Sequence, residues 1–272
     1  MHNITRNIVA LISAMPVKLA GYLLIAGSLL LATTVHAEKI SVVAASDLKF
    51  AMDEIVTIFK ATNPGDEVDV TYGSSGKFHT QIQQGAPYDI FFSADIALPR
   101  ELVKSGLAVS DVKPYAFGRI VLWSASMDAS KMTLASLTDP KIAHVDIANP
   151  KHAPYGKRAE EALRASGLLE KVESKLVYGE NIAQTAQFVQ TGNAEVGVIA
   201  LALAINPELA NKGGYYLIPD NLHEPLEQGY VITKRAENNA LAKRFADYMG
   251  SKPARAVMTK YGFVLPGEAA GK

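Results

Sequence analysis

The chain has 272 residues, carries 27 Lys and Arg against 27 Asp and Glu, and contains no cysteine. Balanced charge leaves no basic footprint for nucleic acid, so we expect no nucleic-acid partner. The lack of cysteine excludes disulfides, zinc–thiolate sites and cysteine nucleophiles. With 49% hydrophobic and 20% charged residues, the composition is that of a globular protein, long enough for one large domain or two lobes.

Residues 1–37 have the order of a secretory signal peptide. Arg6 and Lys18 come with an apolar run from Leu19 to Val35, which closes on the small-x-small pattern Val35-His36-Ala37. The alternative is an uncleaved anchor, because the run is nearly long enough to span a membrane. We favour cleavage, since no stop-transfer charge cluster follows. No cysteine follows for a lipid anchor, so we expect an exported protein without one.

From residue 38 onward, short apolar or β-branched runs alternate with segments of helical period. Such alternation predicts an α/β fold with parallel sheets that carry helices on both faces. The predicted strands and strand-like runs are 40–44, 68–72, 89–93, 119–124, 142–147, 175–178, 195–199 and 230–233. The predicted helices are 47–59, 76–84, 97–105, 155–166, 181–191, 239–249 and 253–261.

Four strand-to-helix junctions are small, polar or glycine-bearing where the chain turns, at 45–47, 72–77, 149–156 and 178–182. The first turn of a helix has backbone N–H groups without intrahelical partners and the positive end of the dipole, so it favours anions. Ligands of open α/β sheets bind beyond the carboxyl ends of the strands. Two junctions from each half of the chain could therefore converge on one small oxyanion, which needs only hydrogen-bond donors.

The same residues are also ordinary helix caps and turn residues, and for any one junction alone that explanation is the better one. The loop 73–77, Gly-Ser-Ser-Gly-Lys, is the most suggestive because it is small enough for close backbone approach. It is no Walker A loop, since Phe78 follows Lys77. Lys77, Lys151 and Lys157 either steer anions or are solvated residues of helix faces.

Catalytic signatures are weak. Lys77 stands where a Gly-x-Ser-x-Gly elbow around Ser75 would need its second glycine. The histidines that we considered, His79, His144, His152 and His223, lack metal-ligand spacing. We therefore predict no catalysis, no metal cation and no cofactor, and keep a secreted hydrolase as the less favoured alternative.

Five segments, in this order, resemble the periplasmic molybdate-binding proteins, which are bacterial solute-binding proteins of ABC transporters. The segments are 44–55 (AASDLKFAMDEI), 73–77 (GSSGK), 85–95 (GAPYDIFFSAD), 149–156 (NPKHAPYG) and 260–263 (KYGF). The resemblance covers residues 38–266. Each piece alone is a weak signal, whereas the ordered set is specific.

The resemblance implies a two-lobed periplasmic-binding-protein fold of type II, in which each lobe is a mostly parallel sheet flanked by helices. It places a signal peptide at 1–37, the first part of lobe I at 38–118, lobe II at 119–228 and a C-terminal return of lobe I at 229–272. The cleft between the lobes would close on the anion.

The resemblance also implies which groups bind the anion. The serine hydroxyls would come from Ser46 and Ser75, with Ser74 a weaker match in the same loop. Backbone N–H groups would come from Tyr155 and Ile182 in lobe II. These residues lie in the four junctions that the chemistry of helix starts had already indicated.

Two residues depart from the family pattern. Ala200 stands where some members have a tyrosine hydroxyl, so that Tyr155 compensates or the site is looser. Asp47 lies beside Ser46, where a carboxylate would repel a dianion unless it points away. It could instead accept the proton of hydrogen phosphate.

We therefore expect a monomeric binding protein that captures molybdate, and tungstate as well, and delivers it to the membrane permease of an ABC importer. A binding protein for phosphate or another small oxyanion is the alternative.

Overall fold

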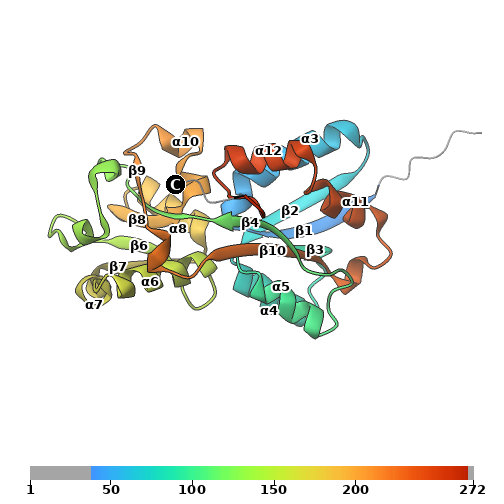
Figure 1. Cartoon of the computed structure of the whole chain (residues 1–272), viewed down its shortest axis with the longest axis horizontal. Coiled ribbons are helices and arrows are strands. Elements are labelled where there is room, and N and C mark those ends of the chain that lie inside the picture. Colours follow the sequence, from blue (N-terminus) through green and yellow to red (C-terminus); the bar gives the residue numbers. More distant parts are fainter. Residues whose placement is uncertain (1–37, 269–272) are drawn as a thin grey trace, which may run out of the picture. The chain divides into compact units, whose positions relative to one another are not determined.

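Two five-stranded sheets with packed helices make up the computed structural model, which describes residues 38–268 (Figure 1). The predicted signal peptide at 1–37 lies outside the described residues. Within the described part of the chain, no helix is long and apolar enough to cross a membrane.

The first sheet has the strand order β2-β1-β3-β10-β4. Strand β1 runs parallel to β2 and β3, whereas β10 runs antiparallel to both of its neighbours. One strand direction therefore dominates the sheet, and β10 alone opposes it. The strands are β1 Lys39–Ala45, β2 Glu67–Gly73, β3 Ile90–Ser93, β4 Lys113–Gly118 and β10 Leu226–Ile232.

The second sheet repeats this plan with the order β7-β6-β8-β5-β9. Here β6 runs parallel to β7 and β8, and β5 runs antiparallel to β8 and β9. The strands are β5 Ile120–Trp123, β6 Val145–Ala148, β7 Leu176–Gly179, β8 Val196–Ala200 and β9 Tyr215–Leu217. The prediction of two mostly parallel α/β sheets is thus confirmed.

Both faces of the first sheet are buried, as alternate residues of β1 show. Val42 packs in a core with α3, α11 and α12, whereas Val43 packs in a separate core with α4 and α5. Side chains of successive strand residues point to opposite faces, so an apolar run such as β1 is typical of a strand covered on both sides. These helices are α3 Lys49–Thr62, α4 Ser75–Gln83, α5 Ala97–Lys104, α11 Ala240–Tyr248 and α12 Lys252–Lys260.

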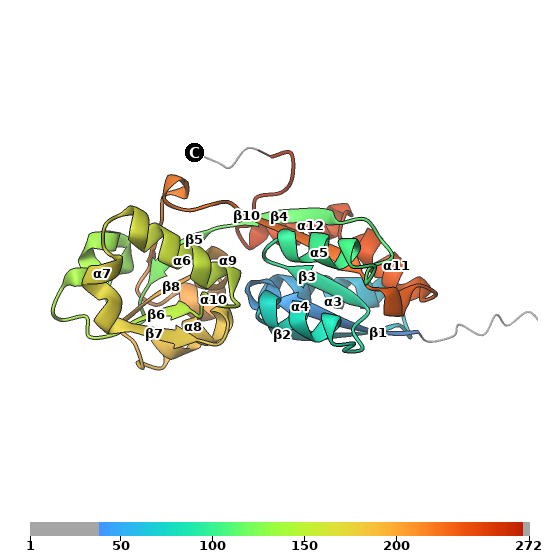
Figure 2. The same cartoon turned by 90° about the horizontal axis from the view of Figure 1, so that it is seen from below.

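The second sheet shares one large core with its helices, in which Trp123 on β5 is fully buried. The Trp123 indole N–H donates to the backbone carbonyl of Lys212 at 3.1 Å, so its polar atom is also satisfied. Figure 2 shows α6 to α10 grouped around this sheet. Their bounds are α6 Pro154–Ala165, α7 Leu169–Val172, α8 Ile182–Gln190, α9 Leu201–Ala204 and α10 Pro207–Ala210.

The chain passes between the sheets on neighbouring strands. Only Arg119 separates the end of β4 at Gly118 from the start of β5 at Ile120. The return strand β10 begins at Leu226, which pairs directly with Gly118. The proposed lobe boundaries at 118/119 and 228/229 stay a prediction.

Some strand bounds differ from those expected. Strand β10 begins at Leu226 rather than residue 230, because Gln228 and Gly229 interrupt the apolar pattern where the ladder has an irregularity. Strand β4 was not predicted, since it starts Lys-Pro and proline is unusual within strands. Strand β9 was also missed, because it is only three residues long and two of them are exposed.

Candidate functional site

A small cavity, with a volume of about 10 Å³, lies where the four junctions meet. Every predicted anion donor lies in its wall, and all of them are buried: Ser46, Ser74, Ser75, Tyr155 and Ile182. The other residues of the wall are Ala45, Asp47, Gly73, Ala94, Ala153, Pro154 and Asn181. The structure therefore brings the predicted residues together, while their contact with an anion stays a prediction.

Helix α4 begins at the cavity and directs one backbone donor toward it. The N–H of Phe78 donates to the Ser74 carbonyl at 3.1 Å, and the N–H of Gly76 donates to the His152 carbonyl at 2.9 Å. Ser75 is the first residue of the helix, so its N–H has no acceptor within the helix. Within residues 38–268 no other group accepts it.

Helices α6 and α8 each leave an N–H in the same way. The first intrahelical bond of α6 joins the Lys157 N–H to the Ala153 carbonyl, which leaves the Tyr155 N–H unbonded in the described residues. In α8, Asn181 caps the helix by accepting the N–H groups of residues 183 and 184 through its side chain, both at 3.1 Å. The N–H of Ile182 is thereby left as a further donor of that first turn.

The three predicted serines differ in whether their hydroxyl group already donates a hydrogen bond within the protein. The Ser75 hydroxyl accepts the Ala94 N–H at 3.0 Å, so its own hydrogen stays available to the cavity. The Ser46 hydroxyl donates to Asn181 Oδ1 at 3.0 Å and accepts an N–H of α8. The Ser74 hydroxyl donates to the His152 carbonyl. Ser75 is therefore the serine best placed to donate to an anion without first giving up a bond.

The loop that carries Ser74 and Ser75 lies directly against the junction of the second sheet. A Cβ added at Gly76 would come within 2.5 Å of the His152 carbonyl oxygen, which accepts the Gly76 N–H. Only glycine permits that approach. The loop is thus small enough for close backbone approach to the neighbouring junction, whereas its approach to an anion stays a prediction.

Asp47 points away from the serines and into a buried hydrogen-bond group. Its Oδ2 accepts the Tyr155 hydroxyl at 2.8 Å and the Gln228 side-chain amide at 2.8 Å. Burial raises the pKa of Asp47, and the two hydrogen bonds oppose that shift. Its Oδ1 is buried without a hydrogen-bond partner in the described residues.

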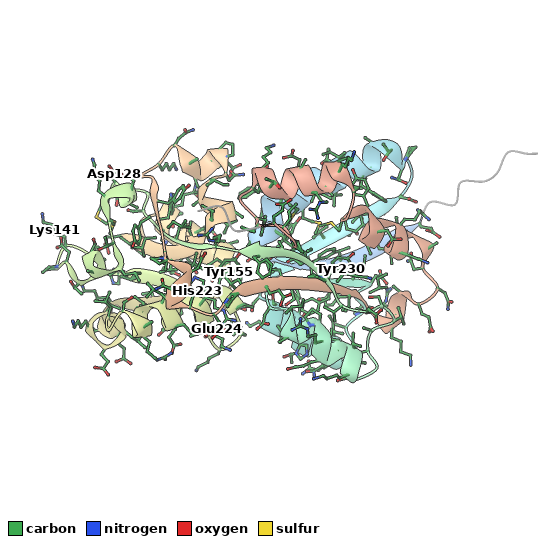
Figure 3. All side chains as sticks on the ribbon, in the orientation of Figure 1. Asp128, Lys141, Tyr155, His223, Glu224 and Tyr230 are labelled. Atoms are coloured by element: carbon green, nitrogen blue, oxygen red, sulfur yellow. The ribbon has the colours of Figure 1, made fainter. Side chains whose placement is uncertain are left out.

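The Tyr155 hydroxyl is not a substitute for the missing donor at Ala200. It donates to Asp47, and burial together with the Asp47 charge raises its pKa well above the usual range, so it stays protonated. Figure 3 labels Tyr155, which lies beside the strands that pass between the sheets. Tyr155 can therefore serve an anion through its backbone N–H, while its side chain is engaged elsewhere.

No Lys, Arg or His side chain lines the cavity. Lys77 forms an ion pair with Glu180 from the opposite junction, and Lys151 and Lys157 are exposed. Within the described residues no three His, Cys, Asp or Glu side chains gather as a metal site. The cavity therefore offers neutral donors and three helix starts, and its chemistry is that of an oxyanion site.

Gln228 and Asn181 are functional candidates that the sequence did not single out. Asn181 was visible only as part of a junction, and its Asn-at-Ncap position is the signal that identifies it as a cap. Gln228 lies in a strand far from any junction, and nothing in the sequence connects it with Asp47.

The chain is similar to proteins of a known family. The family model of the bacterial extracellular solute-binding proteins matches residues 40–264. The chain is 38% identical over 240 residues to the molybdate-binding protein ModA of Azotobacter vinelandii, covering 88% of this chain and 95% of that one. It is 39% identical over 229 residues to ModA of Rhodobacter capsulatus, covering 84% and 88%.

Solved structures show the same likeness. The periplasmic molybdate-binding protein of Azotobacter vinelandii superposes with a TM-score of 0.79 at 33% identity, covering 84% of this chain and 99% of that one. The sulfate-binding protein SubI of Mycobacterium tuberculosis H37Rv superposes with a TM-score of 0.70 at 16% identity, covering 85% and 88%. The second likeness shows the fold alone.

Proposed function

The chain belongs to the bacterial extracellular solute-binding proteins, among the relatives of molybdate-binding proteins, and from this premise we propose that it captures molybdate in the cavity between its sheets. Tungstate, a close relative in size and charge, would bind there too. The bound anion would then be delivered to the membrane permease of an ABC importer.

The observation that carries this proposal is the convergence of unpaired N–H groups from three helix starts. Ser75, Tyr155 and Ile182 line the cavity, and their N–H groups have no partner within the described residues; the Ser75 hydroxyl hydrogen is a further donor. Charge-assisted hydrogen bonds contribute about 1.5–3 kcal/mol each, and a cavity closed to water strengthens them. A fully deprotonated dianion can accept all of these hydrogen bonds and has no proton of its own that would need an acceptor.

Selection among oxyanions would rest on size. Molybdate and sulfate are both tetrahedral dianions, so charge does not separate them. The donors here belong to helices fixed on three different strands, so their spacing cannot shrink freely around a smaller anion. We therefore propose that sulfate binds more weakly because it cannot meet all donors at once.

Phosphate is a second candidate, and one observation favours it. Asp47 Oδ1 is buried in the cavity wall without a partner and could accept the proton of hydrogen phosphate. The hydrogen bonds from Tyr155 and Gln228 hold the other carboxylate oxygen away.

We propose no catalytic step. Ser46 and Ser75 are not activated nucleophiles, because their hydroxyls lie beside backbone or amide groups rather than a free base. The histidine ring nearest to a serine is His152, whose pKa is lowered by burial, and it contacts Ser74 at 3.0 Å. The Ser74 hydroxyl donates to the His152 carbonyl, so this pair acts as a structural link.

Export and assembly complete the proposal. The related solved structure is described as periplasmic, and the same location fits this chain if residues 1–37 are removed after Ala37. N-terminal sequencing of the exported protein would test the cleavage. We further propose that the protein acts as a monomer, with the anion enclosed by residues 38–118 and 229–272 on one side and 119–228 on the other.

The test is a titration of the purified protein with molybdate, tungstate, sulfate and phosphate at equal ionic strength. Thermal melting and calorimetry would be followed, since a ligand that binds the native state raises its melting temperature. We expect tight binding of molybdate and tungstate with intact anion recovered afterwards. Binding of phosphate alone would replace the first candidate with the second, and binding of none would refute the assignment of the cavity.

A further inference from the structure

The hydrogen-bond group around Asp47 joins three parts of the chain that are distant in sequence. Asp47 follows β1, Tyr155 lies in the first turn of α6, and Gln228 lies on the returning strand β10. The Gln228 amide donates to Asp47 Oδ2 at 2.8 Å and to the Tyr155 hydroxyl at 3.1 Å. All three side chains are at most 2% exposed.

Gly118 packs directly against the side chains of Tyr155 and Gln228. A Cβ at Gly118 would overlap the Tyr155 hydroxyl and would lie 2.7 Å from Gln228 Nε2. The backbone of Gly118 is not in the left-handed region, so its conformation alone does not require glycine. Space for the Tyr155 hydroxyl is therefore the reason that a side chain is excluded at the end of β4.

We infer that Asp47, Tyr155, Gln228 and Gly118 form a clasp that is completed only when the two lobes close, and that Asp47 and Gln228 are positioning residues for the Tyr155 backbone donor. Asp47 follows β1 of the first sheet and Tyr155 lies in α6, which follows β6 of the second sheet, so their hydrogen bond exists only while the two sheets are held together. When it forms, the first turn of α6 is fixed with its N–H toward the cavity. This inference rests on the proposed function and goes beyond it by naming what holds the closed form.

The clasp also explains why a carboxylate is tolerated beside an anion site. Two neutral groups, the Tyr155 hydroxyl and the Gln228 amide, both donate to Asp47 Oδ2 and stabilise the negative charge on that oxygen. A buried carboxylate without such donors would be expensive to keep. The Asp47 carboxylate, which would otherwise repel a dianion, thus forms hydrogen bonds that join the lobes.

Tyr155→Phe is the cleanest test, because it removes the hydroxyl and keeps the backbone N–H. We expect the Kd for molybdate to rise about tenfold, the size expected for a hydrogen bond to a charged group, with most of the change in the dissociation rate. Tyr230→Phe is the matched control: Tyr230 is buried and its hydroxyl donates to the Ala246 carbonyl at 2.8 Å. Its Kd should stay within about twofold of the unaltered protein, because that hydrogen bond joins β10 to α11 and involves no residue of the clasp.

Gly118→Ala tests the same clasp from the other side. The added methyl should obstruct closure, so that molybdate binds more weakly and small-angle scattering shows a smaller decrease in the radius of gyration on binding. In a Tyr155→Phe background the added methyl should weaken binding less, because the oxygen it would overlap is gone. Circular dichroism would show that each variant is folded.

Two results would overturn the clasp. One is a Tyr155→Phe variant that binds molybdate within about twofold of the unaltered protein, and the other is a Gly118→Ala penalty that is the same in both backgrounds. Binding by the unaltered protein tests the proposed function, whereas the comparison among variants tests the clasp. The two ideas can therefore fail separately.

Discussion

Replacing Ser75 by alanine separates two roles of one hydroxyl group. The hydroxyl oxygen accepts the Ala94 N–H at 3.0 Å, and its hydrogen remains available to an anion in the cavity. Ser75 is fully buried, so water cannot replace either bond in the folded protein. The backbone N–H of Ser75 is unaffected by the change, and we therefore expect binding to weaken rather than disappear.

The two losses appear in different measurements. Leaving the Ala94 N–H buried and unpaired should lower the free energy of unfolding by about 1–3 kcal/mol. Losing one charge-assisted hydrogen bond to the anion should weaken binding by about 1.5–3 kcal/mol, which raises the Kd about 10- to 150-fold. The first effect is present without ligand, and the second appears only in the titration.

Urea denaturation and calorimetry with molybdate would measure the two quantities, with Ser93→Ala as control. The Ser93 hydroxyl is equally buried and accepts the Asp95 N–H at 3.1 Å, but Ser93 does not line the cavity. The control should lose stability and keep its affinity. An unchanged Kd in Ser75→Ala, or an equal rise in both variants, would refute the role of the Ser75 hydroxyl.

Three further changes test other parts of the structure. Asn181→Ala removes the cap of α8 and should lower the free energy of unfolding by about 0.5–2 kcal/mol in urea denaturation; an unchanged value would show that the cap is not needed. Burial raises the pKa of Asp146 to about 7, so the folded protein should lose stability as pH rises from about 4 through 7, and Asp146→Asn should remove that loss in melts at pH 5 and 8. An identical pH dependence in both proteins would contradict this. Lys77→Gln breaks a half-exposed ion pair with Glu180, worth about 0–1 kcal/mol, so the Kd should change by less than about fivefold, whereas a larger loss would place Lys77 on the anion.

The sequence was informative where chemistry is local. The start of a helix is indicated by local residues, so the four junctions could be predicted before the fold was known. The choice of Ser75, Tyr155 and Ile182 within them came from the resemblance to molybdate-binding proteins. The apolar runs of β1 and β8 likewise indicated strands buried on both faces. Strands with weak patterns, such as β4 and β9, had no comparable signal.

Contacts between distant residues were beyond such reasoning. Asp47 and Gln228 are 181 positions apart in the chain, and no periodicity links them. For the same reason the sequence could not say which way the Asp47 carboxylate points, nor that the Ser46 hydroxyl is engaged by Asn181 while that of Ser75 is free. These choices depend on how the two sheets meet.

The pairing of β4 with β10 at the crossing has a mechanical consequence. The chain leaves and re-enters the first sheet through a ribbon of two hydrogen-bonded strands, β4 and β10, in which Leu226 lies opposite Gly118. Such a ribbon bends across its face more readily than it shears along its length, because shear would break the ladder between the strands. The two lobes should therefore open and close by a single bending motion. The backbone N–H groups of separate helices would then return to the same relative positions each time the lobes close.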